Sequence, residues 1–154
     1  MSYITGIDIT ATSTTVDFQL GQVGQTSDGK LYKYVQYVVG AGAVAAVSGN
    51  VVGYYAASGA SAGQVDIVTA DVTDTARAGA GVLQSAPATE EYCWIQVAGS
   101  ATLTTALTAG ADGNALTLVG AGDSTLDVSG AVTDAVCATA IDASAKIIMC
   151  QFPL

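Results

Sequence analysis

Apolar and polar side chains alternate along much of the chain, which is the pattern of β-strands that bury one face. The clearest case is the stretch 81–99, where Tyr92 and Trp94 would face one side of a strand and Cys93 the other. Pro87 interrupts this stretch and argues against one long helix. The stretch 81–99 therefore predicts two strands, at 81–85 and 92–97, that are joined by a polar turn through 87–91.

Further strands follow from the same alternation and from the Gly, Asn and Asp residues that separate the apolar runs. We expect them at 14–20, 31–39, 44–47, 51–55, 65–68, 101–107, 116–119, 125–128, 131–139 and 146–152. The stretch 131–139 is also compatible with an Ala-rich helix. Tight turns are expected at Asp28-Gly29, Ser48-Gly49-Asn50 and Asp112-Gly113-Asn114.

One helical turn is expected at 69–78, with Thr69 as its N-cap and Asp71 in its first turn. The continuously apolar stretch 146–152 predicts a strand in the middle of a sheet. Short strands with turns roughly every ten residues indicate an all-β fold. We predict a single domain over residues 1–154, a β-sandwich or β-barrel of short antiparallel strands with at most one short helix. Residues 1–10 form either an ordinary first strand or an N-terminal arm that pairs with a neighbour.

The acidic charge of the chain limits the classes of partner that we expect it to bind. Charged residues are 11% of the chain, and four Lys and Arg stand against 13 Asp and Glu, for a net charge of −9. Nucleic acids and anionic membranes are bound mainly through clustered Lys and Arg, so neither is an expected partner. Lys30 and Lys33 are the only close basic pair, and we expect them at the solvated end of a hairpin.

The stretch 34–64 carries no charge and could be mistaken for a membrane-spanning segment. It contains no Leu, Ile or Phe and is interrupted repeatedly by Gly, whereas a spanning helix needs about 20 strongly apolar residues. We therefore predict strands and turns here. Nothing in the first residues, which read Met-Ser-Tyr-Ile, predicts a secretory signal.

Groups that carry catalysis or bind metals are scarce. The chain has no His, and its three Cys, at positions 93, 137 and 150, lack the spacing of a zinc site. We expect these cysteines to be reduced core thiols. Glu90 and Glu91 would point to opposite faces of a strand, and the chain lacks a calcium-binding loop. Two looser oxygen sets remain weak cation candidates: Asp66, Asp71 and Asp74, and the turn 112–114 with Asp123. The sequence thus predicts no catalytic residue, no metal site, no cofactor and no enzymatic activity.

A chain of this kind is expected to act by contact. Aromatic side chains contribute strongly to contact energies, and we predict that Tyr32, Tyr34, Tyr92 and Trp94 anchor either self-association or the subunit core. Thr-rich strands with few Lys leave backbone edges that need cover. We expect a partner or another copy to cover some of them.

Several segments resemble those of tailed-bacteriophage head decoration proteins, also called capsid cement proteins. The segments are LGQVGQTSDGKLYKYVQ, AGAVAAVSGNVVGYY, GVLQSAPATEEYCWIQVAGSATL and the closing strand KIIMCQF. The family pattern corresponds to residues 28–34, 49–52, 81–84 and 92–99. Cys93 stands where the family usually has Gly.

The resemblance implies a structural virion protein that is made in the cytoplasm of a bacterial host and bound to the capsid exterior. Its partners would be the major capsid protein and other copies of itself, as a homotrimer at three-fold and quasi-three-fold positions. Its role would be to hold neighbouring capsomers together. The alternative class is a fibre, tail-spike or adhesin-like binding module that recognises a host surface.

Overall fold

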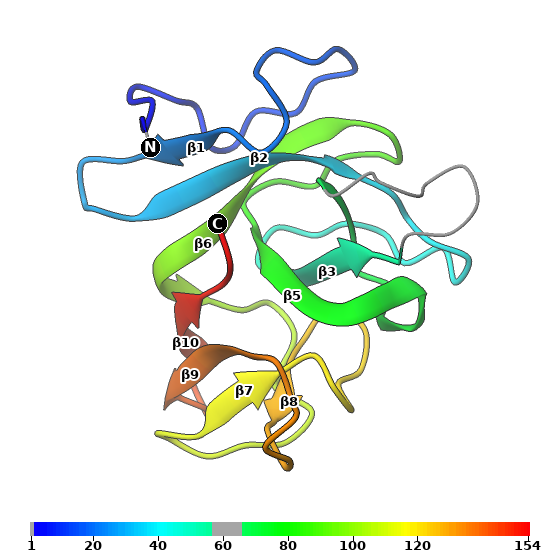
Figure 1. Cartoon of the computed structure of the whole chain (residues 1–154), viewed down its shortest axis with the longest axis vertical. Helices are drawn as coiled ribbons and strands as arrows, with labels where there is room; N and C mark the ends of the chain where they lie inside the picture. The colour runs from blue at the N-terminus through cyan, green and yellow to red at the C-terminus, as the bar shows by residue number, and fades with distance from the viewer. Residues whose placement is uncertain (1, 57–65) are drawn as a thin grey trace.

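The computed structural model describes residues 2–56 and 66–154, and its regular structure there consists of strands and one short 3-10 turn (Figure 1). The strands are β1 (Val23–Gln25), β2 (Leu31–Tyr37), β3 (Val51–Tyr55), β4 (Ile67–Thr69), β5 (Thr75–Leu83), β6 (Tyr92–Thr102), β7 (Ala115–Thr117), β8 (Asp127–Val128), β9 (Val136–Asp142) and β10 (Ile147–Gln151). The 3-10 turn is η2 (Val72–Asp74). The predicted all-β fold is confirmed.

Five of the strands close into a barrel. Their order is β2, β4, β3, β5 and β6, and β6 returns to pair with β2 along most of its length. The β2–β4 pair is parallel and the other pairs of the barrel are antiparallel. The architecture is thus a mixed barrel with extra strands, mostly antiparallel as predicted.

Four of the extra strands extend the barrel on one side, whereas β1 pairs with β2. β10, β9, β7 and β8 continue the sheet from β6 and form the lower part of the molecule in Figure 1. β10 pairs with both β6 and β9, so the strand predicted at 146–152 does lie in the middle of the sheet. One hydrophobic core joins the two parts, because Leu83 and Ile95 of the barrel belong to the same buried cluster as Leu116 and Ile148 of the extension.

Glycines allow the barrel wall and the extension to approach each other closely. A Cβ atom at Gly79 of β5 would lie 2.7 Å from Cys137 Sγ and 2.9 Å from Phe152 Cε1. A Cβ atom at Gly53 of β3 would lie 2.5 Å from Leu118 Cδ2. Any larger residue at either position would push the extension away from the barrel.

The strand predicted at 14–20 is wrong. This segment is irregular, with Val16 57% and Phe18 38% exposed. Its polar residues bond to one another, since Thr15 N donates to Ser13 Oγ and Thr15 Oγ1 to Asp17 Oδ1. Such local side-chain bonds compete with the hydrogen bonds of a sheet.

The predicted helical turn at 69–78 is also wrong in extent. Only η2 is helical, and β5 begins directly after it. Its N-cap is Asp71, whose carboxylate accepts from Thr73 N, whereas Thr69 ends β4 and its Oγ1 accepts from Asp71 N. The Thr69 hydroxyl and the Asp71 carboxylate therefore each close a short turn. These two turns follow one another and take the place of a longer helix.

Several strand boundaries also differ. The stretch 44–47 is not a strand, the strand predicted at 101–107 ends at Thr102, and β9 begins at Val136. Before Val136, the Asp134 carboxylate accepts hydrogen bonds from Gly130 N and Ala131 N, which closes a turn. β4 begins at Ile67, and Val65 lies outside the described residues.

The pair predicted at 116–119 and 125–128 is present as β7 and β8. The three predicted tight turns are present as well, each with its Gly at positive φ.

Candidate functional site

The four aromatic residues predicted as anchors lie on the outer face of the β2–β6 pair. Tyr34 is directly opposite Trp94 in the register, and their ring centroids are 5.1 Å apart. Tyr92 stacks on Tyr34 at 6.1 Å. Tyr32 is paired with Gln96 farther along the same face. The period-two alternation of both strands brings these side chains together.

The N-terminal segment covers this aromatic face. Phe18 lies 5.2 Å from both Tyr34 and Trp94, measured between ring centroids. Ile4 and Ile7 pack against the same cluster. As a result Tyr32, Tyr34 and Trp94 are buried inside the chain, while Tyr92 is partly exposed. The role of Phe18 was missed because the sequence placed it on a strand of its own.

Residues 2–10, part of the predicted arm, lie against their own chain. Ile4 N donates to Val23 O at 3.1 Å, and Gln25 N donates to Ile4 O at 2.8 Å. These bonds cover the outer edge of β1. Ser13 makes a second bridge with Tyr92 of β6. The chain itself therefore covers these two stretches of backbone edge.

Lys33 is buried, contrary to the expected solvated position. Its Nζ donates to Tyr54 Oη at 2.8 Å, lies 3.2 Å from Asp66 Oδ1, and sits 5.0 Å from the Tyr54 ring centroid. Burial alone would lower the pKa of Lys33, but the Tyr54 hydroxyl and the Asp66 carboxylate raise it above its usual value. The ammonium is held charged, so this arrangement ties β2 to β3 and to the residue that precedes β4, and it offers no nucleophile.

The acidic residues considered as cation ligands mostly bind backbone N–H groups. Asp71 Oδ2 accepts from Gly42 N at 2.7 Å, and Asp74 accepts from Ala41 N. Asp123 accepts from Val72 N, and Asp112 accepts from Ala143 N. Within residues 2–56 and 66–154 no group of three His, Cys, Asp or Glu is placed to hold a metal ion. These carboxylates stabilise turns.

The three cysteines are unpaired and buried, as predicted. Burial raises the pKa of each thiol from its ordinary value of 9.0 to about 12. A thiol with so high a pKa is protonated at neutral pH and is a poor nucleophile.

The outer face of the extension is free of charge at its centre. β6, β7 and β10 contain no charged residue, and β9 contains only Asp142 at its end. Met149 of β10 is exposed and lies between Ser100 of β6 and Thr139 of β9. Ile141 of β9 is exposed as well. We call this surface the uncharged face. It is made of the outward side chains of β6 from residue 98 onward, of β10 and of β9.

The sequence did contain a signal for the uncharged face. Burial alternates strictly along β10, where Ile148 and Cys150 are buried and Met149 and Gln151 are exposed. The sequence predicts a continuously apolar strand here, because Met counts as apolar wherever it points.

Comparisons with protein-family models, with curated proteins and with solved structures found no match to this chain. No helix of the described part of the chain is long and apolar enough to cross a membrane, and residues 57–64 of the uncharged stretch lie outside that part.

Proposed function

We propose that the chain is a structural virion protein, a decoration or cement protein bound to the outer surface of an icosahedral phage capsid. The resemblance of four segments to that family motivates the proposal. The uncharged face is the observation in the structure that supports it best. A contact protein needs a surface that loses little when water is removed, and this surface has no ionised group at its centre to desolvate.

Electrostatics favour the same surface for self-association. Two copies with a net charge of −9 repel each other, and the repulsion is weakest where no carboxylate lies near the contact. Under the proposal, copies meet through the uncharged face as a homotrimer. The acidic remainder of the surface then faces solvent or the major capsid protein. No catalytic step is part of this function.

Labelling of purified virions tests the proposal. Particles from a host strain that produces the chain are treated with an antibody to it and imaged with gold labels. Label spread over the heads is the expected result. Label confined to tails or fibres would favour the alternative, a module that recognises a host surface. Absence of label from complete virions would refute both functions.

A second measurement examines the cementing role. Heads assembled without the chain should release their DNA at a lower temperature than complete heads, and added purified chain should restore the original release temperature. Equal release temperatures with and without bound chain would show that it decorates the shell without stabilising it.

A further inference from the structure

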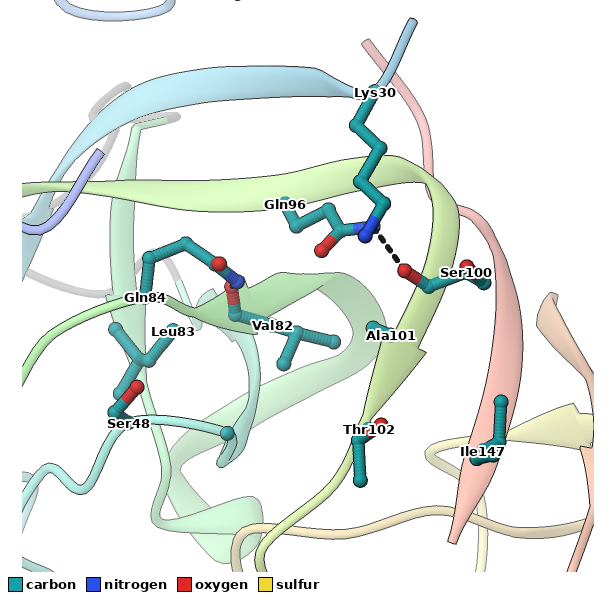
Figure 2. Close-up of a pocket in the computed structure, with 11 residues that line it drawn as sticks. Lys30, Ser48, Val82, Leu83, Gln84, Gln96, Ser100, Ala101, Thr102 and Ile147 are labelled. Atoms are coloured by element: carbon teal, nitrogen blue, oxygen red, sulfur yellow. Dashed lines mark hydrogen bonds between the residues drawn. The ribbon is translucent and has the colours of Figure 1, made fainter. Parts of the chain in front are cut away.

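A polar hollow of about 320 Å³ lies between β5 and β6, next to the uncharged face (Figure 2). Its polar lining comes from Gln84, Gln96, Ser100 and Thr102, with Lys30 at the rim. Ile147 is the apolar residue of the lining that is partly exposed, whereas Val82 and Leu83 are almost fully buried. None of these residues takes part in the aromatic cluster or in the ion pair of Lys33.

Gln96 is the best-fixed polar group in the hollow. The residue is only 3% exposed. Its Nε2 donates to Ala98 O at 3.2 Å and to Ser100 O at 2.9 Å, which uses both N–H groups and sets the orientation of the amide. Its Oε1 accepts no hydrogen bond from the part of the chain that the structure describes, and Figure 2 shows this oxygen turned away from Ser100, toward the hollow. Solvent reaches this oxygen, so water supplies its donor in the free chain and a ligand hydroxyl can replace that water.

Lys30 is held over the same space. Its methylene groups cross Gly99, where a Cβ atom would lie 2.8 Å from Lys30 Cγ. Gly99 also has a φ of +94°, a conformation that favours glycine. The Lys30 ammonium lies 3.8 Å from Asp28 Oδ2, so its charge is partly compensated. The hollow therefore offers strong donors with little net positive charge.

We propose that this hollow binds one ring of a neutral sugar. Sugar hydroxyls donate and accept at once, and they match an accepting Gln96 oxygen, a donating Lys30 ammonium and neighbouring hydroxyls. Ile147, the partly exposed apolar residue of the lining, can contact the C–H face of the ring. An anionic ligand fits less well, because Asp28 is close to the only cation of the rim and the whole chain is acidic. The proposal goes beyond the capsid function and does not depend on it.

The volume limits the ligand to a small one. Small-molecule pockets span roughly 300–1,000 Å³, so this hollow is at the lower end and accommodates a single ring. For a ligand of about twelve heavy atoms, ordinary ligand efficiencies give a Kd on the order of 1 mM.

Titration of the ¹⁵N-labelled chain with glucose, galactose and N-acetylglucosamine, followed by amide chemical shifts, tests the proposal. With at least one of these sugars, saturable shifts are expected at the lining residues and not at the Lys33–Asp66 pair. Methyl α- and β-glucosides, in which the anomeric oxygen is blocked, distinguish a free sugar from one at the end of a glycan. Glycerol and acetate serve as controls for any polyol and any carboxylate.

The Lys30→Met variant should weaken the binding at least fivefold. Arg77→Met is the matched control, since it also removes one positive charge but lies outside the hollow. The Gln96→Met variant should also bind more weakly if it folds. If it does not fold, the Lys30→Met variant still decides the test. The proposal is overturned if no sugar produces saturable shifts up to about 50 mM, roughly fifty times the expected Kd. It is also overturned if acetate alone produces them, or if Arg77→Met weakens the binding as much as Lys30→Met.

Discussion

Trp94 touches side chains from segments that are far apart in the sequence. It packs against Tyr34 of β2 and Phe18 of the N-terminal segment, and a Cβ atom at Gly24 would lie 3.2 Å from its ring. It is also only 1% exposed. A single large side chain thus holds β1, β2, β6 and the N-terminal segment together.

Truncation of Trp94 to Ala should therefore lower the free energy of unfolding by about 3–5 kcal/mol, the usual range for a buried large aromatic residue. Urea denaturation of the purified chain measures this loss. Tyr3→Ala is the control, because Tyr3 is 40% exposed and should cost less than about 0.5 kcal/mol. Similar losses for the two variants would contradict the buried role of Trp94.

The buried thiols predict a dependence of stability on pH. Each thiol has a pKa of about 12 in the folded chain and an ordinary value of 9.0 when unfolded. Below pH 9 both states are protonated and the stability is complete. Between pH 9 and 12 only the unfolded chain releases these protons, so the free energy of unfolding falls as the pH rises.

Urea denaturation at pH 8 and pH 10 measures this fall, which should shrink in a Cys93→Ala variant. Tyr37, whose pKa burial also raises to about 12, adds a later loss of the same sign. At pH 8 the native thiols should resist a thiol reagent such as DTNB, whereas all three should react in urea. Rapid reaction without urea would show that a thiol is accessible.

At the scale of the elements, one glycine in β5 and one in β3 allow these strands to pack closely against the extension. Gly79 and Gly53 leave room for Cys137, Phe152 and Leu118, so the barrel wall and the extension share one core. The bulges between β3 and β5 occur beside these glycines.

Gly79→Ala should destabilise the chain by about 1–3 kcal/mol, because the new methyl group would overlap Cys137 Sγ. Thermal unfolding followed by circular dichroism measures the change. Gly130→Ala is the matched control, since a Cβ atom at Gly130 meets no atom within 4 Å. If both variants have the same melting temperature as the wild type, the extension does not pack against the barrel at Gly79 as closely as described.

Period-two alternation located β2, β6 and β10 well. β10 buries one face, whereas β2 and β6 alternate between the barrel core and the aromatic cluster and are buried on both faces. The closure of the barrel and the parallel β2–β4 pair were not predictable, since they depend on contacts between distant segments. The segment 14–20 alternates like a strand, but its Ser13, Thr15 and Asp17 side chains bond locally.

The candidate sites were predictable to a smaller degree. The four aromatic residues could be named from the sequence, yet only the structure shows that residues 4–18 cover them. The polar hollow could not be foreseen, because Lys30, Gln84 and Gln96 come from three separate segments.

At the scale of the whole molecule, the carboxylates and the uncharged face occupy different parts of the surface. The carboxylates lie mostly in turns and in the N-terminal segment, whereas the uncharged face presents Met149 and Ile141 on a continuous sheet. A face of this kind suits contact between copies that carry the same charge.

Met149→Glu should therefore disrupt self-association, because it places a like charge at the centre of each contact. Light scattering should give three times the chain's 15.2 kDa mass for the wild type and a single chain for this variant. Val16→Glu, an equal change at an exposed apolar residue of the N-terminal segment, should leave the mass unchanged. A wild-type mass of one chain at all concentrations would contradict association in solution.

The closed barrel has one more consequence, which concerns storage of the protein. Segments with high β-propensity and no charge, such as Ile147–Gln151, can form amyloid when they are exposed. Such growth needs a long free strand as a template, yet here the last strand of the sheet, β8, has two residues, and the edge of β1 is capped by Ile4. The folded chain should therefore stay clear at high concentration, and its tendency to form fibrils should appear only when the barrel opens.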